Sequence, residues 1–342
     1  MTPSREISVV IPTYQRRALL ERTLHFLAHQ TYPPDAFEVV VSIDGSEDGT
    51  EEMVRRTRAP YRLICLWQEN RGRAAACNAG LHRAQGDLIV LLDDDMEPAP
   101  TFLEAHARAH EGRTHEGKER LGVLGAVPVP IEPDASPVTR YIGTKFNRHL
   151  ATLSRPDYQL KLRDFYSGNF SIKRSVLLEV GGFDEEFDVY GNEDLDLSLR
   201  LQHAGVAFAY CREAAAWQRY TKDFAALSRD TVAKGRTAVL LARKHPGSFD
   251  DLKLGTYGHA PWVVRQIREA LLRLGERQPA FPEAIIRFVM WLERFPVFST
   301  EAAYVQVLGY FYWMGARAAL REHQDAGSGL DVLKDLSRGV QA

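Results

Sequence analysis

Short apolar runs alternate with longer amphipathic stretches through the first part of the chain. The runs are rich in Val, Ile and Leu and are bounded by polar or turn residues, as in strands that are buried on both faces. Strands that alternate with helices indicate parallel strands joined by crossover helices, so the pattern predicts an α/β fold with a doubly wound sheet. The predicted strands cover residues 7–11, 37–43, 61–67, 88–92 and 121–127, and the predicted helices cover residues 17–29, 50–58, 73–84 and 99–110, the second of them capped by Thr50.

The pattern loosens after Pro128. Three prolines interrupt a stretch with little periodicity that runs to about residue 164, which predicts a long loop. The segments predicted beyond it are extended at 165–173, helical at 195–203 and extended at 206–211. From Pro246 the pattern is mostly helical, with aromatic-rich stretches at 285–295 and 304–313. A weakly ordered tail is predicted after Glu322.

Composition restricts the class of protein and its partners. The chain has 342 residues, 45% hydrophobic and 26% charged, which suits one large domain and a smaller appendage. Lys and Arg number 43 and Asp and Glu number 45, so a formal net charge of -2 provides no global basic field to attract nucleic acid. Three widely spaced cysteines argue against a disulfide framework and suit a reducing compartment, where we expect them to be small buried hydrophobes.

Two further features set the expected location. The N-terminus has no apolar signal-peptide core. The least polar late stretch, at 302–316, is uncharged for 15 residues, whereas a spanning helix needs about 20. We therefore expect a cytoplasmic protein that is, at most, peripheral at the inner face of the membrane.

An acidic cluster follows the strand predicted at 88–92. It consists of Asp93, Asp94 and Asp95. Ligands of open parallel sheets bind outside the carboxyl ends of the strands, so these carboxylates are expected to face a crevice. Clustered carboxylates need a compensating cation, and their hard oxygens suit Mg²⁺ or Mn²⁺ together with substrate phosphates. The alternative is an acidic loop that caps the following helix.

Polar residues also follow the first two predicted strands. Tyr14 could stack on a base, Thr13 could form a hydrogen bond, and Asp44 could accept one from a base or ribose. Pro12 and Arg16 lie in the same segment as Tyr14. The alternative for Asp44 is a simple turn with the glycine that follows it.

Two helix starts bear charged side chains. The loop Asn70 to Gly72 leads into a helix whose free amides suit an anion, and Arg73 could approach a phosphate or orient the acidic cluster. The alternative is a small-residue helix that packs closely on the sheet. Glu193 and Asp194 begin another helix, where a carboxylate could take a proton from a hydroxyl or simply cap the helix.

In this order, these segments resemble the family 2 glycosyltransferases, from about residue 7 to about residue 246. The resemblance implies a GT-A fold, that is, a Rossmann-like, mostly parallel central sheet flanked by helices, with a helical C-terminal extension. It also implies a catalytic domain at 1–245, with nucleotide-sugar binding at 1–127 and acceptor binding and catalysis at 128–245, followed by a helical region at 246–342. The motifs that resemble the family are Pro12-Thr13-Tyr14, Asp44-Gly45-Ser46, Asn70-x-Gly72, Asp93-Asp94-Asp95, Gly168-Asn169, Gly181-Gly182-Phe183-Asp184 and Glu193-Asp194.

The resemblance also implies roles for single residues. Asp194 would be the catalytic base, with Glu193 beside it, and Asp93 and Asp95 would hold Mg²⁺ or Mn²⁺ and the diphosphate. The acceptor or donor sugar would lie near Gly168, Asn169, Trp217 and Gln218. The residues implied for the nucleotide sugar are Pro12, Thr13, Tyr14, Arg16, Asp44, Arg73, Asp93, Asp94 and Asp95.

The chain departs from the family pattern at three places. One Asp precedes Gly45 where relatives often have two, and Cys77 stands where an Arg is frequent. Gln218 stands where many relatives have a His that can ligate the metal. Because an amide is a weak neutral ligand, the metal would be held mainly by Asp95 and phosphates. Lys234-Gly235-Arg236 falls where relatives carry a Gly-Arg pair. The cations of Lys234 and Arg236 could compensate at the diphosphate for the missing His.

The function implied is an inverting transfer of a sugar from a nucleotide diphosphate sugar to a hydroxyl acceptor. UDP-sugar is the first expectation for the donor, with GDP- or dTDP-sugar as alternatives. The acceptor would be a glycan, a lipid-linked glycan or a small molecule in polysaccharide or glycoconjugate biosynthesis, and the enzyme a hexosyl- or related transferase. A non-catalytic sugar-nucleotide scaffold or sensor is the alternative. The C-terminal aromatic residues are expected to fill a core first, and to contact a membrane or a second subunit second.

Other readings of the sequence are weaker. A near-match to a phosphate-binding loop at 112–119 has Glu119 in place of Ser or Thr, and no glycine-rich fingerprint follows the first strand, which excludes a nicotinamide dehydrogenase. A sugar nucleotidyltransferase would need a glycine-rich basic loop at the same place. His106 and His110 share a helix face and could bind Zn²⁺, but without an obvious third ligand we expect them to be surface residues.

Overall fold

The structure is a computed structural model that describes residues 6–114, 120–295 and 300–322. The tail expected after Glu322 lies outside the described residues. Contacts between Cα atoms divide the chain into two compact units, each made of three segments. The first comprises Met1–Glu132, Ile142–Asp188 and Glu193–Tyr220, and the second comprises Pro133–Tyr141, Val189–Asn192 and Thr221–Ala342.

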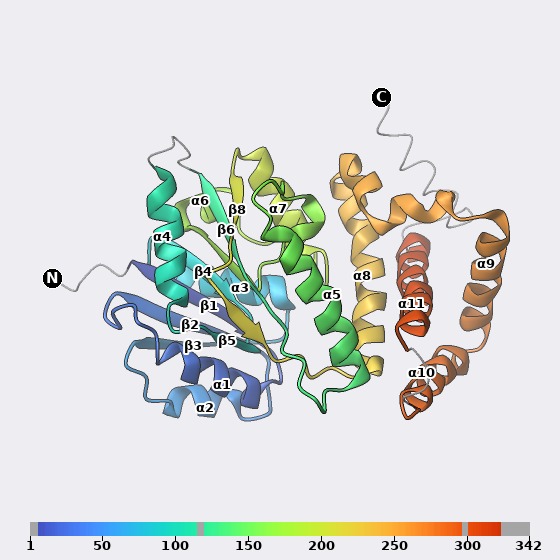
Figure 1. Cartoon of the computed structure of the whole chain (residues 1–342), viewed down its shortest axis with the longest axis horizontal. Helices are drawn as coiled ribbons and strands as arrows, with labels where there is room; N and C mark the ends of the chain where they lie inside the picture. The colour runs from blue at the N-terminus through green and yellow to red at the C-terminus, as the bar shows by residue number, and fades with distance from the viewer. Residues whose placement is uncertain (1–5, 115–119, 296–299, 323–342) are drawn as a thin grey trace. The chain divides into compact units, whose positions relative to one another are not determined.

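A seven-stranded sheet forms the centre of the first unit (Figure 1). Its strand order is β3-β2-β1-β4-β7-β6-β8, and all neighbours are parallel except where β7 pairs with β4 and β6. The expected mostly parallel sheet is therefore confirmed. The strands are β1 (Ile7–Thr13), β2 (Phe37–Asp44), β3 (Arg62–Gln68), β4 (Leu88–Leu92), β6 (Leu121–Gly125), β7 (Asn169–Lys173) and β8 (Ala207–Cys211).

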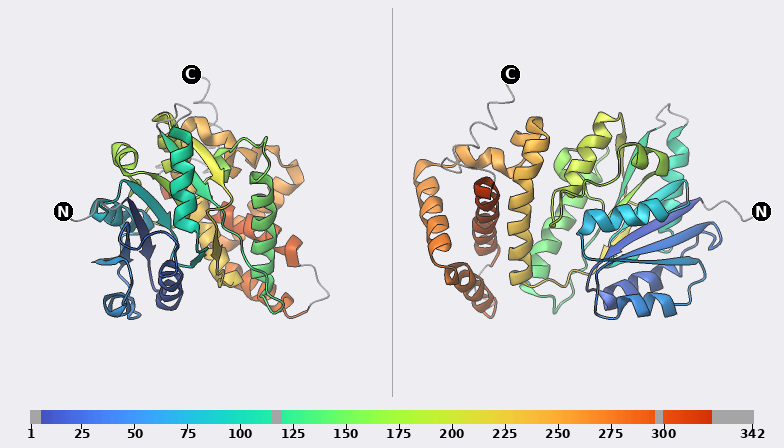
Figure 2. Two further views of the ribbon diagram at one scale, coloured as in Figure 1. Left: turned by 60° about the vertical axis from the view of Figure 1, so that its left-hand side comes forward. Right: turned by 180° about the vertical axis from the view of Figure 1, so that it is seen from behind.

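Helices cover both faces of this sheet (Figures 1 and 2). Because successive side chains of a strand point to opposite faces, Val9 and Ile11 pack in one core and Val10 packs in the other. The first core joins the sheet to α1 (Arg17–Leu27), α2 (Thr50–Arg56) and α4 (Phe102–Thr114), and the second joins it to α3 (Arg73–Arg83), α6 (Arg174–Glu179) and α7 (Glu193–His203). Apolar runs without alternation are therefore buried on both sides, as predicted.

The long loop predicted between residues 128 and 164 is wrong. Helix α5 covers Pro137–Leu153, and a 3-10 turn follows at Leu162–Asp164. Pro137 occupies the first position of α5, where a missing backbone N–H costs no intrahelical hydrogen bond. The three prolines therefore mark the approach to a helix and not the absence of one. The extended stretch predicted from residue 165 contributes to the sheet only from Asn169.

The expected cap at Thr50 is also wrong. Gly49 precedes the first residue of α2 and adopts a left-handed conformation with φ of 80°. The side chain of Asp48 accepts hydrogen bonds from the backbone N–H of Thr50 at 3.2 Å and of Arg17 at 2.9 Å. One carboxylate therefore serves the first turns of α1 and α2.

Two short strands lie beside the main sheet and were not predicted. β5 (Met96–Pro98) pairs antiparallel with β9 (Ala216–Gln218), and Met96 lies opposite Gln218. Three residues are too few to show a period in the sequence. This pairing brings the segment after β9 to the acidic cluster that follows β4.

The second unit is helical, as expected for the C-terminal region. Its main helices are α8 (Phe224–Lys244), α9 (Trp262–Arg277), α10 (Ala280–Leu292) and α11 (Thr300–Glu322), with 3-10 turns at Pro246–Asp251 and Lys253–His259. Helix α8 precedes Pro246, where the boundary was expected, but its contacts group it with this unit. A Cβ at Gly235 would lie 2.0 Å from the Tyr312 carbonyl oxygen, and one at Gly315 would lie 1.9 Å from that of Val232. Glycines therefore permit α8 and α11 to approach closely.

The aromatic residues of the second unit divide into two groups. Those of α11, from Tyr304 to Trp313, are buried, so the expected packing role is confirmed there. It is wrong for α10, where Phe288 is 57% exposed and Trp291 is 48% exposed. Among the described helices, none combines the length and the apolar character needed to cross a membrane.

Candidate active site

Side chains from the carboxyl ends of β1 and β4 meet at one edge of the sheet. The Thr13 hydroxyl donates a hydrogen bond to Asp94 Oδ2 at 2.7 Å. Arg16 Nη1 donates to Asp94 Oδ1 at 2.9 Å and to Asp95 Oδ2 at 3.1 Å. Parallel order places these two strand ends side by side, as the sequence predicted, and a single guanidinium joins two carboxylates of the acidic cluster.

The acidic cluster is only partly neutralised. Asp94 is 4% exposed and Asp95 is 5% exposed. Burial, with the charges of Asp93 and Asp94 added, raises the pKa of Asp95 to about 7, although Arg16 and Gln218 oppose the shift. Burial also raises the pKa of Asp94, against the opposing effects of Arg16 and Thr13. A bound cation at this place would relieve the repulsion that remains.

Arg73 connects the acidic cluster to the start of α7. Its Nη2 lies 2.8 Å from Asp93 Oδ1, and its Nη1 lies 3.2 Å from Asp194 Oδ1 and 3.6 Å from Glu193 Oε1. Arg73 is the first residue of α3, and its position is fixed by the loop that leads into that helix. The residues expected for metal binding and for proton transfer therefore contact the same guanidinium.

The two carboxylate oxygens of Asp194 have different surroundings. Arg73 and the Ser167 hydroxyl both donate to Oδ1. The side chain is 27% exposed, whereas the neighbouring Glu193 side chain is 3% exposed. Arg73 and Ser167 thus leave Oδ2 of Asp194 without a contact from either of them, and the neighbouring Glu193 is almost fully buried. The contact between Ser167 and Asp194 was not predicted from the sequence.

Asp44 holds a loop in place. Its Oδ1 accepts from Gln68 Nε2 at 2.8 Å and from the Arg71 backbone N–H at 2.9 Å, and its Oδ2 accepts from the Gly72 N–H at 2.9 Å. A carboxylate has about four acceptor positions, so one remains on Oδ2. Asp44 is therefore more than part of a turn with Gly45, because its carboxylate organises the loop that positions Arg73. A nucleotide contact through the remaining position stays a prediction.

The residues expected to contact a nucleotide differ in accessibility. Pro12 is buried inside β1, and the buried Thr13 hydroxyl is already bonded to Asp94. Tyr14 is 50% exposed, and the Arg16 side chain is 27% exposed. Contact of a nucleotide with Pro12 or Thr13 stays a prediction, and the side chains of both residues are covered by protein. Tyr14 and Arg16 are the members of this group that a ligand can reach.

Gly168 and Asn169 were expected near a sugar, which stays a prediction, and in the structure both make contacts within the protein. A Cβ at Gly168 would lie 2.3 Å from Asp93 Oδ2, and the Asp93 N–H donates to the Gly168 carbonyl at 3.0 Å. Asn169 is fully buried, and its amide donates to the carbonyls of Ala126 at 3.0 Å and Ala214 at 2.9 Å. Gly168 therefore sets the place of Asp93, and Asn169 ties β7 to its neighbours.

The prediction that His106 and His110 are surface residues is wrong. His106 Nε2 lies 2.9 Å from Asn169 Oδ1, and Ser171 Oγ lies 2.8 Å from His106 Nδ1 and 2.9 Å from His110 Nε2. Burial lowers the pKa of His106 to about 3 and that of His110 to about 4. Two neutral imidazoles thus form a hydrogen-bonded chain with Ser171 and Asn169 behind the acidic cluster, which does not favour the Zn²⁺ alternative.

The segment after β9 completes the site. Gln218 Nε2 lies 3.3 Å from both carboxylate oxygens of Asp95. The Arg219 N–H donates to the Asp95 carbonyl at 2.8 Å, and Arg219 Nε donates to Glu97 Oε1 at 2.6 Å. Trp217 is 39% exposed and lies opposite Glu97 in the β5–β9 pair. Sequence reasoning placed Gln218 correctly beside Asp95 and missed Arg219, because the short strand that aligns it has no sequence signature.

The Gly235-Arg236 pair has structural contacts within the second unit. Gly235 makes room for α11, and Arg236 Nη1 and Nη2 lie 3.0 and 2.6 Å from the two carboxylate oxygens of Glu322. These contacts do not support the expected compensation at a diphosphate. Arg16 and Arg73 are the cations beside the acidic cluster.

The acidic residues fit a divalent cation that is shared with a ligand. Within residues 6–114, 120–295 and 300–322, no three His, Cys, Asp or Glu side chains are arranged to hold a metal ion by themselves. Mg²⁺ usually keeps several waters and takes one or two carboxylates together with substrate phosphates. Asp93 and Asp95 can supply two such carboxylates at the end of β4.

Comparison with known families gives two matches. The model described as glycosyl transferase family 2 matches residues 8–181, which is about half of the chain. A second model, described as N-terminal domain of galactosyltransferase, matches residues 147–223. The two matches together include the strand ends, the acidic cluster, Asp194 and Gln218.

The curated relatives include glycosyltransferases from bacteria. Validoxylamine A glucosyltransferase of Streptomyces hygroscopicus subsp. limoneus is 34% identical over 228 residues, which cover 61% of this chain and 50% of the relative. Chondroitin synthase of Escherichia coli is 26% identical over 269 residues, which cover 70% of this chain and 38% of the relative. The chain thus spans about half the length of the validoxylamine A glucosyltransferase that it matches.

Solved structures share the fold along most of the chain, and they include mannosyltransferase PcManGT from Pyrobaculum calidifontis in complex with GDP-Man and Mn²⁺. It has a TM-score of 0.58 at 20% identity and covers 93% of this chain and 88% of its own. TarS 1–349 of S. aureus in complex with UDP-GlcNAc has a TM-score of 0.51 at 15% identity, with 93% and 92% covered. These likenesses confirm the GT-A fold with a helical C-terminal region. The match over residues 8–181 shows that the chain belongs to glycosyl transferase family 2.

Proposed function

We propose that this protein is a metal-dependent, inverting glycosyltransferase that transfers a sugar from a nucleotide diphosphate sugar to a hydroxyl group. The observation that supports it most is the position of Arg73, which contacts Asp93 and Asp194 with the two arms of one guanidinium. That contact puts a metal-binding carboxylate and a proton acceptor on opposite sides of one cation. Transfer by a single displacement needs both groups in one crevice, on either side of the reacting sugar.

The donor is proposed to bind along the carboxyl edge of the sheet. Tyr14 has an exposed ring for the base, and Arg16, two residues further on, contacts Asp94 and Asp95 of the acidic cluster. Asp93 and Asp95 would hold Mg²⁺ or Mn²⁺, which supplies Lewis-acid stabilisation of the departing diphosphate when it is bound. PcManGT in complex with GDP-Man and Mn²⁺ and TarS in complex with UDP-GlcNAc support a donor of this class. UDP-sugar remains the first proposal, with GDP- and dTDP-sugar next.

The acceptor is proposed to react at Asp194. Arg73 and Ser167 hold Oδ1, so Oδ2 can accept the proton of the attacking hydroxyl while the carboxylate stays oriented. The hydroxyl oxygen forms a bond to the anomeric carbon as the bond from that carbon to the diphosphate oxygen breaks. One displacement on one face of the sugar inverts the anomeric configuration.

Replacement of the proposed base tests this function. Asp194→Asn should lose transfer by about 100- to 10000-fold, because the amide cannot take the proton. Donor affinity should stay close to that of the wild type, since the amide oxygen can still accept from Ser167 and Arg73. A screen of nucleotide sugars with Mn²⁺, read as release of nucleoside diphosphate, measures the loss of transfer and, through the KM for the donor, the donor affinity. The anomeric configuration of the product is read from the same reaction. The exposed Asp35 provides the control Asp35→Asn.

Two outcomes of that screen contradict the proposal. Undiminished turnover by Asp194→Asn excludes Asp194 as the base, and retention of configuration excludes a single displacement. Donor binding without hydrolysis or transfer under any metal would instead favour the alternative function, a sugar-nucleotide scaffold or sensor. The neutral Gln218 beside Asp95 is the feature that keeps this alternative open.

A peripheral membrane contact is proposed for the second unit. Phe288 and Trp291 of α10 are exposed, and Trp262 of α9 is 66% exposed. Both helices also carry arginines, and exposed aromatic side chains together with basic ones favour helices that lie in the membrane interface. Sedimentation with anionic vesicles measures the contact, and the double variant Phe288→Ser, Trp291→Ser should reduce the bound fraction several-fold if the proposal is correct.

A further inference from the structure

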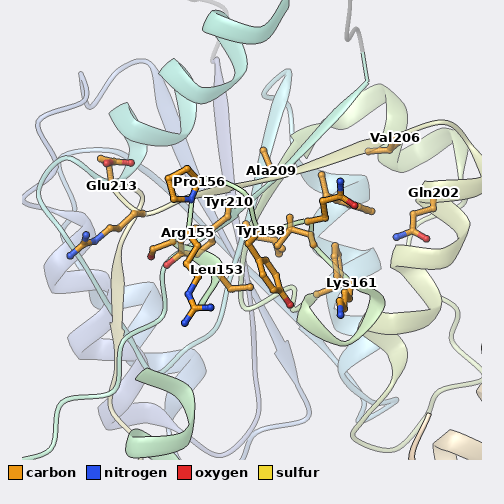
Figure 3. Close-up of a pocket in the computed structure, with 17 residues that line it drawn as sticks. Leu153, Arg155, Pro156, Tyr158, Lys161, Gln202, Val206, Ala209, Tyr210 and Glu213 are labelled. Carbon is orange, nitrogen blue, oxygen red and sulfur yellow. The ribbon is translucent and has the colours of Figure 1, made fainter. Parts of the chain in front are cut away.

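The first unit contains a cavity whose lining includes none of the acidic cluster, and Figure 3 shows the residues that line it. Its volume is about 840 Å³, within the range of small-molecule sites. The walls come from residues 153–161, from the C-terminal part of α7 and from the edge strand β8. Lys161 and Gln202 lie toward one end of the cavity, and Glu213 lies at the other. No residue of the proposed active site lines it.

The charges of this cavity are mostly positive. Arg155, Lys161 and Arg212 line it together with one carboxylate, that of Glu213. All four side chains belong to exposed residues. In the part of the chain that the structure describes, none of the three cations forms a salt bridge with an acidic side chain. Cations without intramolecular partners are available to an anionic ligand.

The aromatic walls are fixed by hydrogen bonds. The Tyr158 hydroxyl donates to Asp164 Oδ2 at 2.9 Å, and the Lys161 backbone N–H donates to the same oxygen at 2.7 Å. Asp164 is 1% exposed, so a buried carboxylate anchors the segment that forms one wall. Tyr210 of β8, on another wall, is hydrogen-bonded to Ser154. The cavity is therefore largely formed before any ligand arrives.

The floor of the cavity is apolar. Phe165 and Phe208 form an edge-to-face pair with ring centroids 5.2 Å apart, and Leu124 lies beside them. The amide side chains of Gln159 and Gln202 line the rim. Aromatic rings can pack against the apolar face of a sugar ring, and amides can form hydrogen bonds with hydroxyl groups. A ligand with ring faces, hydroxyl groups and negative charge satisfies all parts of this lining.

We propose that this cavity is a second carbohydrate site, which binds a glycan that bears carboxylate or phosphate groups. Gln202 follows Asp194 by eight residues on α7, which corresponds to about 12 Å along the helix. An oligomeric acceptor can therefore place an anionic unit in the cavity while its terminal hydroxyl lies at Asp194. This second step rests on the proposed function, but binding to the cavity does not.

A titration tests the site without turnover. Oligogalacturonate and mannose 6-phosphate are the carboxylate and phosphate probes, and a maltooligosaccharide of the same length as the oligogalacturonate is the uncharged one. Calorimetry at low ionic strength should show binding of at least one charged probe and little binding of the uncharged one. Arg155→Glu combined with Lys161→Glu should raise the dissociation constant at least tenfold. The matched control is Arg58→Glu, an exposed charge reversal beyond α2 in the same unit.

The possible results separate clearly. Binding of oligogalacturonate alone assigns a carboxylate ligand, and binding of mannose 6-phosphate alone assigns a phosphate ligand. The proposal is overturned if neither charged probe binds, if the uncharged probe binds equally well, if inorganic phosphate competes as strongly as the charged sugars, or if the double variant binds like the wild type. Circular dichroism verifies that the double variant is folded, as expected for two exposed positions.

The link to the acceptor has its own readout. With an acidic acceptor, the double variant should raise the KM for the acceptor about tenfold and leave kcat and the KM for the donor unchanged. Equal effects on kcat would contradict a remote acceptor site. Absence of turnover in the wild type would contradict the proposed function, whereas the titration result would stand independently.

Discussion

Two arginines determine how the acidic side chains of the crevice are arranged. Arg16 joins Asp94 to Asp95, and Arg73 joins Asp93 to Asp194. A guanidinium offers five donors in a planar fork, so it can hold two carboxylates at a fixed separation where an ammonium cannot. The spacing between the proposed metal-binding and proton-accepting groups is therefore set by one side chain, that of Arg73.

Arg73→Lys separates this geometric role from charge alone. The charge is kept, but one ammonium cannot reach Asp93 and Asp194 in the same way as the two arms of the guanidinium. We expect kcat for transfer to fall by about 100-fold, because small displacements of reacting groups have effects of that size. The KM for the donor should change much less. Steady-state kinetics with the control Arg58→Lys measure this, and an unchanged kcat would exclude a positioning role for Arg73.

Sequence reasoning was accurate for residues at strand ends and inaccurate for residues whose role depends on burial. Arg73 was expected to orient the acidic cluster and Gln218 to stand near the metal, and both contact the cluster; the contact of Arg16, expected only at the nucleotide sugar, was not predicted. The structural contacts of Asn169 were not predicted, because its partners are carbonyls far away in the chain. Ser167 and Arg219 were missed for the same reason: a contact made by folding leaves no periodic or spacing signal.

The buried histidines give a pH dependence of stability. Their pKa values, about 3 for His106 and about 4 for His110, lie below the ordinary value of 6.5. Below pH 6.5 the unfolded chain therefore binds protons that the folded chain excludes until about pH 4, so the free energy of unfolding falls as the pH falls. The slope is up to about 1.4 kcal/mol per pH unit for each imidazole, and the contribution is complete above pH 6.5.

His106→Gln should make this slope shallower. The glutamine stays neutral in both states, so one of the two contributions between pH 6.5 and about pH 4 disappears. Stability at pH 7 should also fall, by about 1–3 kcal/mol, because the buried chain loses a well-placed partner. Urea unfolding at several pH values measures both effects. His29→Gln, at an exposed position, should retain the wild-type slope, and an unchanged slope in His106→Gln would contradict the assignment.

At the scale of elements, the contact between α8 and α11 depends on glycine. A Cβ at Gly315 would lie 1.9 Å from the Val232 carbonyl oxygen, which is backbone and cannot rotate away. At Gly309, in the same helix, the nearest atom is Lys253 Nζ at 3.9 Å. The same substitution therefore meets a rigid neighbour at one position and open space at the other.

Alanine at these two positions should change stability in opposite directions. Gly315→Ala should destabilise the protein by about 3 kcal/mol, since the helices must move apart and the packed aromatic core must loosen. Gly309→Ala should stabilise it by up to about 1 kcal/mol through helix propensity alone. Denaturant unfolding of both variants provides the measurement. Equal effects of the two substitutions would show that α8 and α11 do not pack as described.

Elements with a long periodic pattern could be predicted, and the others could not. The parallel strands and their crossover helices were found because their apolar runs are buried on both faces. Helix α5 was missed because prolines at its approach were taken as breaks within a loop. β5 and β9 exist through their pairing with each other, and three residues show no period. The exposed face of α10 was misjudged because hydrophobicity does not show which residues meet a partner helix.

At the scale of the whole molecule, neither of the two units is a single continuous segment of the chain. It passes between them five times, because each unit is made of three segments. One of the passages lies inside α5, whose first residues belong to the second unit and whose remainder belongs to the first. A helix propagates through hydrogen bonds between successive turns, so its two ends do not unfold independently at low cost.

These passages predict that the two units unfold together. The nucleoside diphosphate found by the donor screen, added with Mn²⁺, should bind residues of the first unit and raise the melting temperature by mass action. Because α5 and the other passages couple the units, we expect a single calorimetric transition that moves as a whole. Gly315→Ala, which lies in the second unit, should lower that same transition. Two separate transitions, one moved only by the ligand and the other only by the substitution, would show that the units are independent.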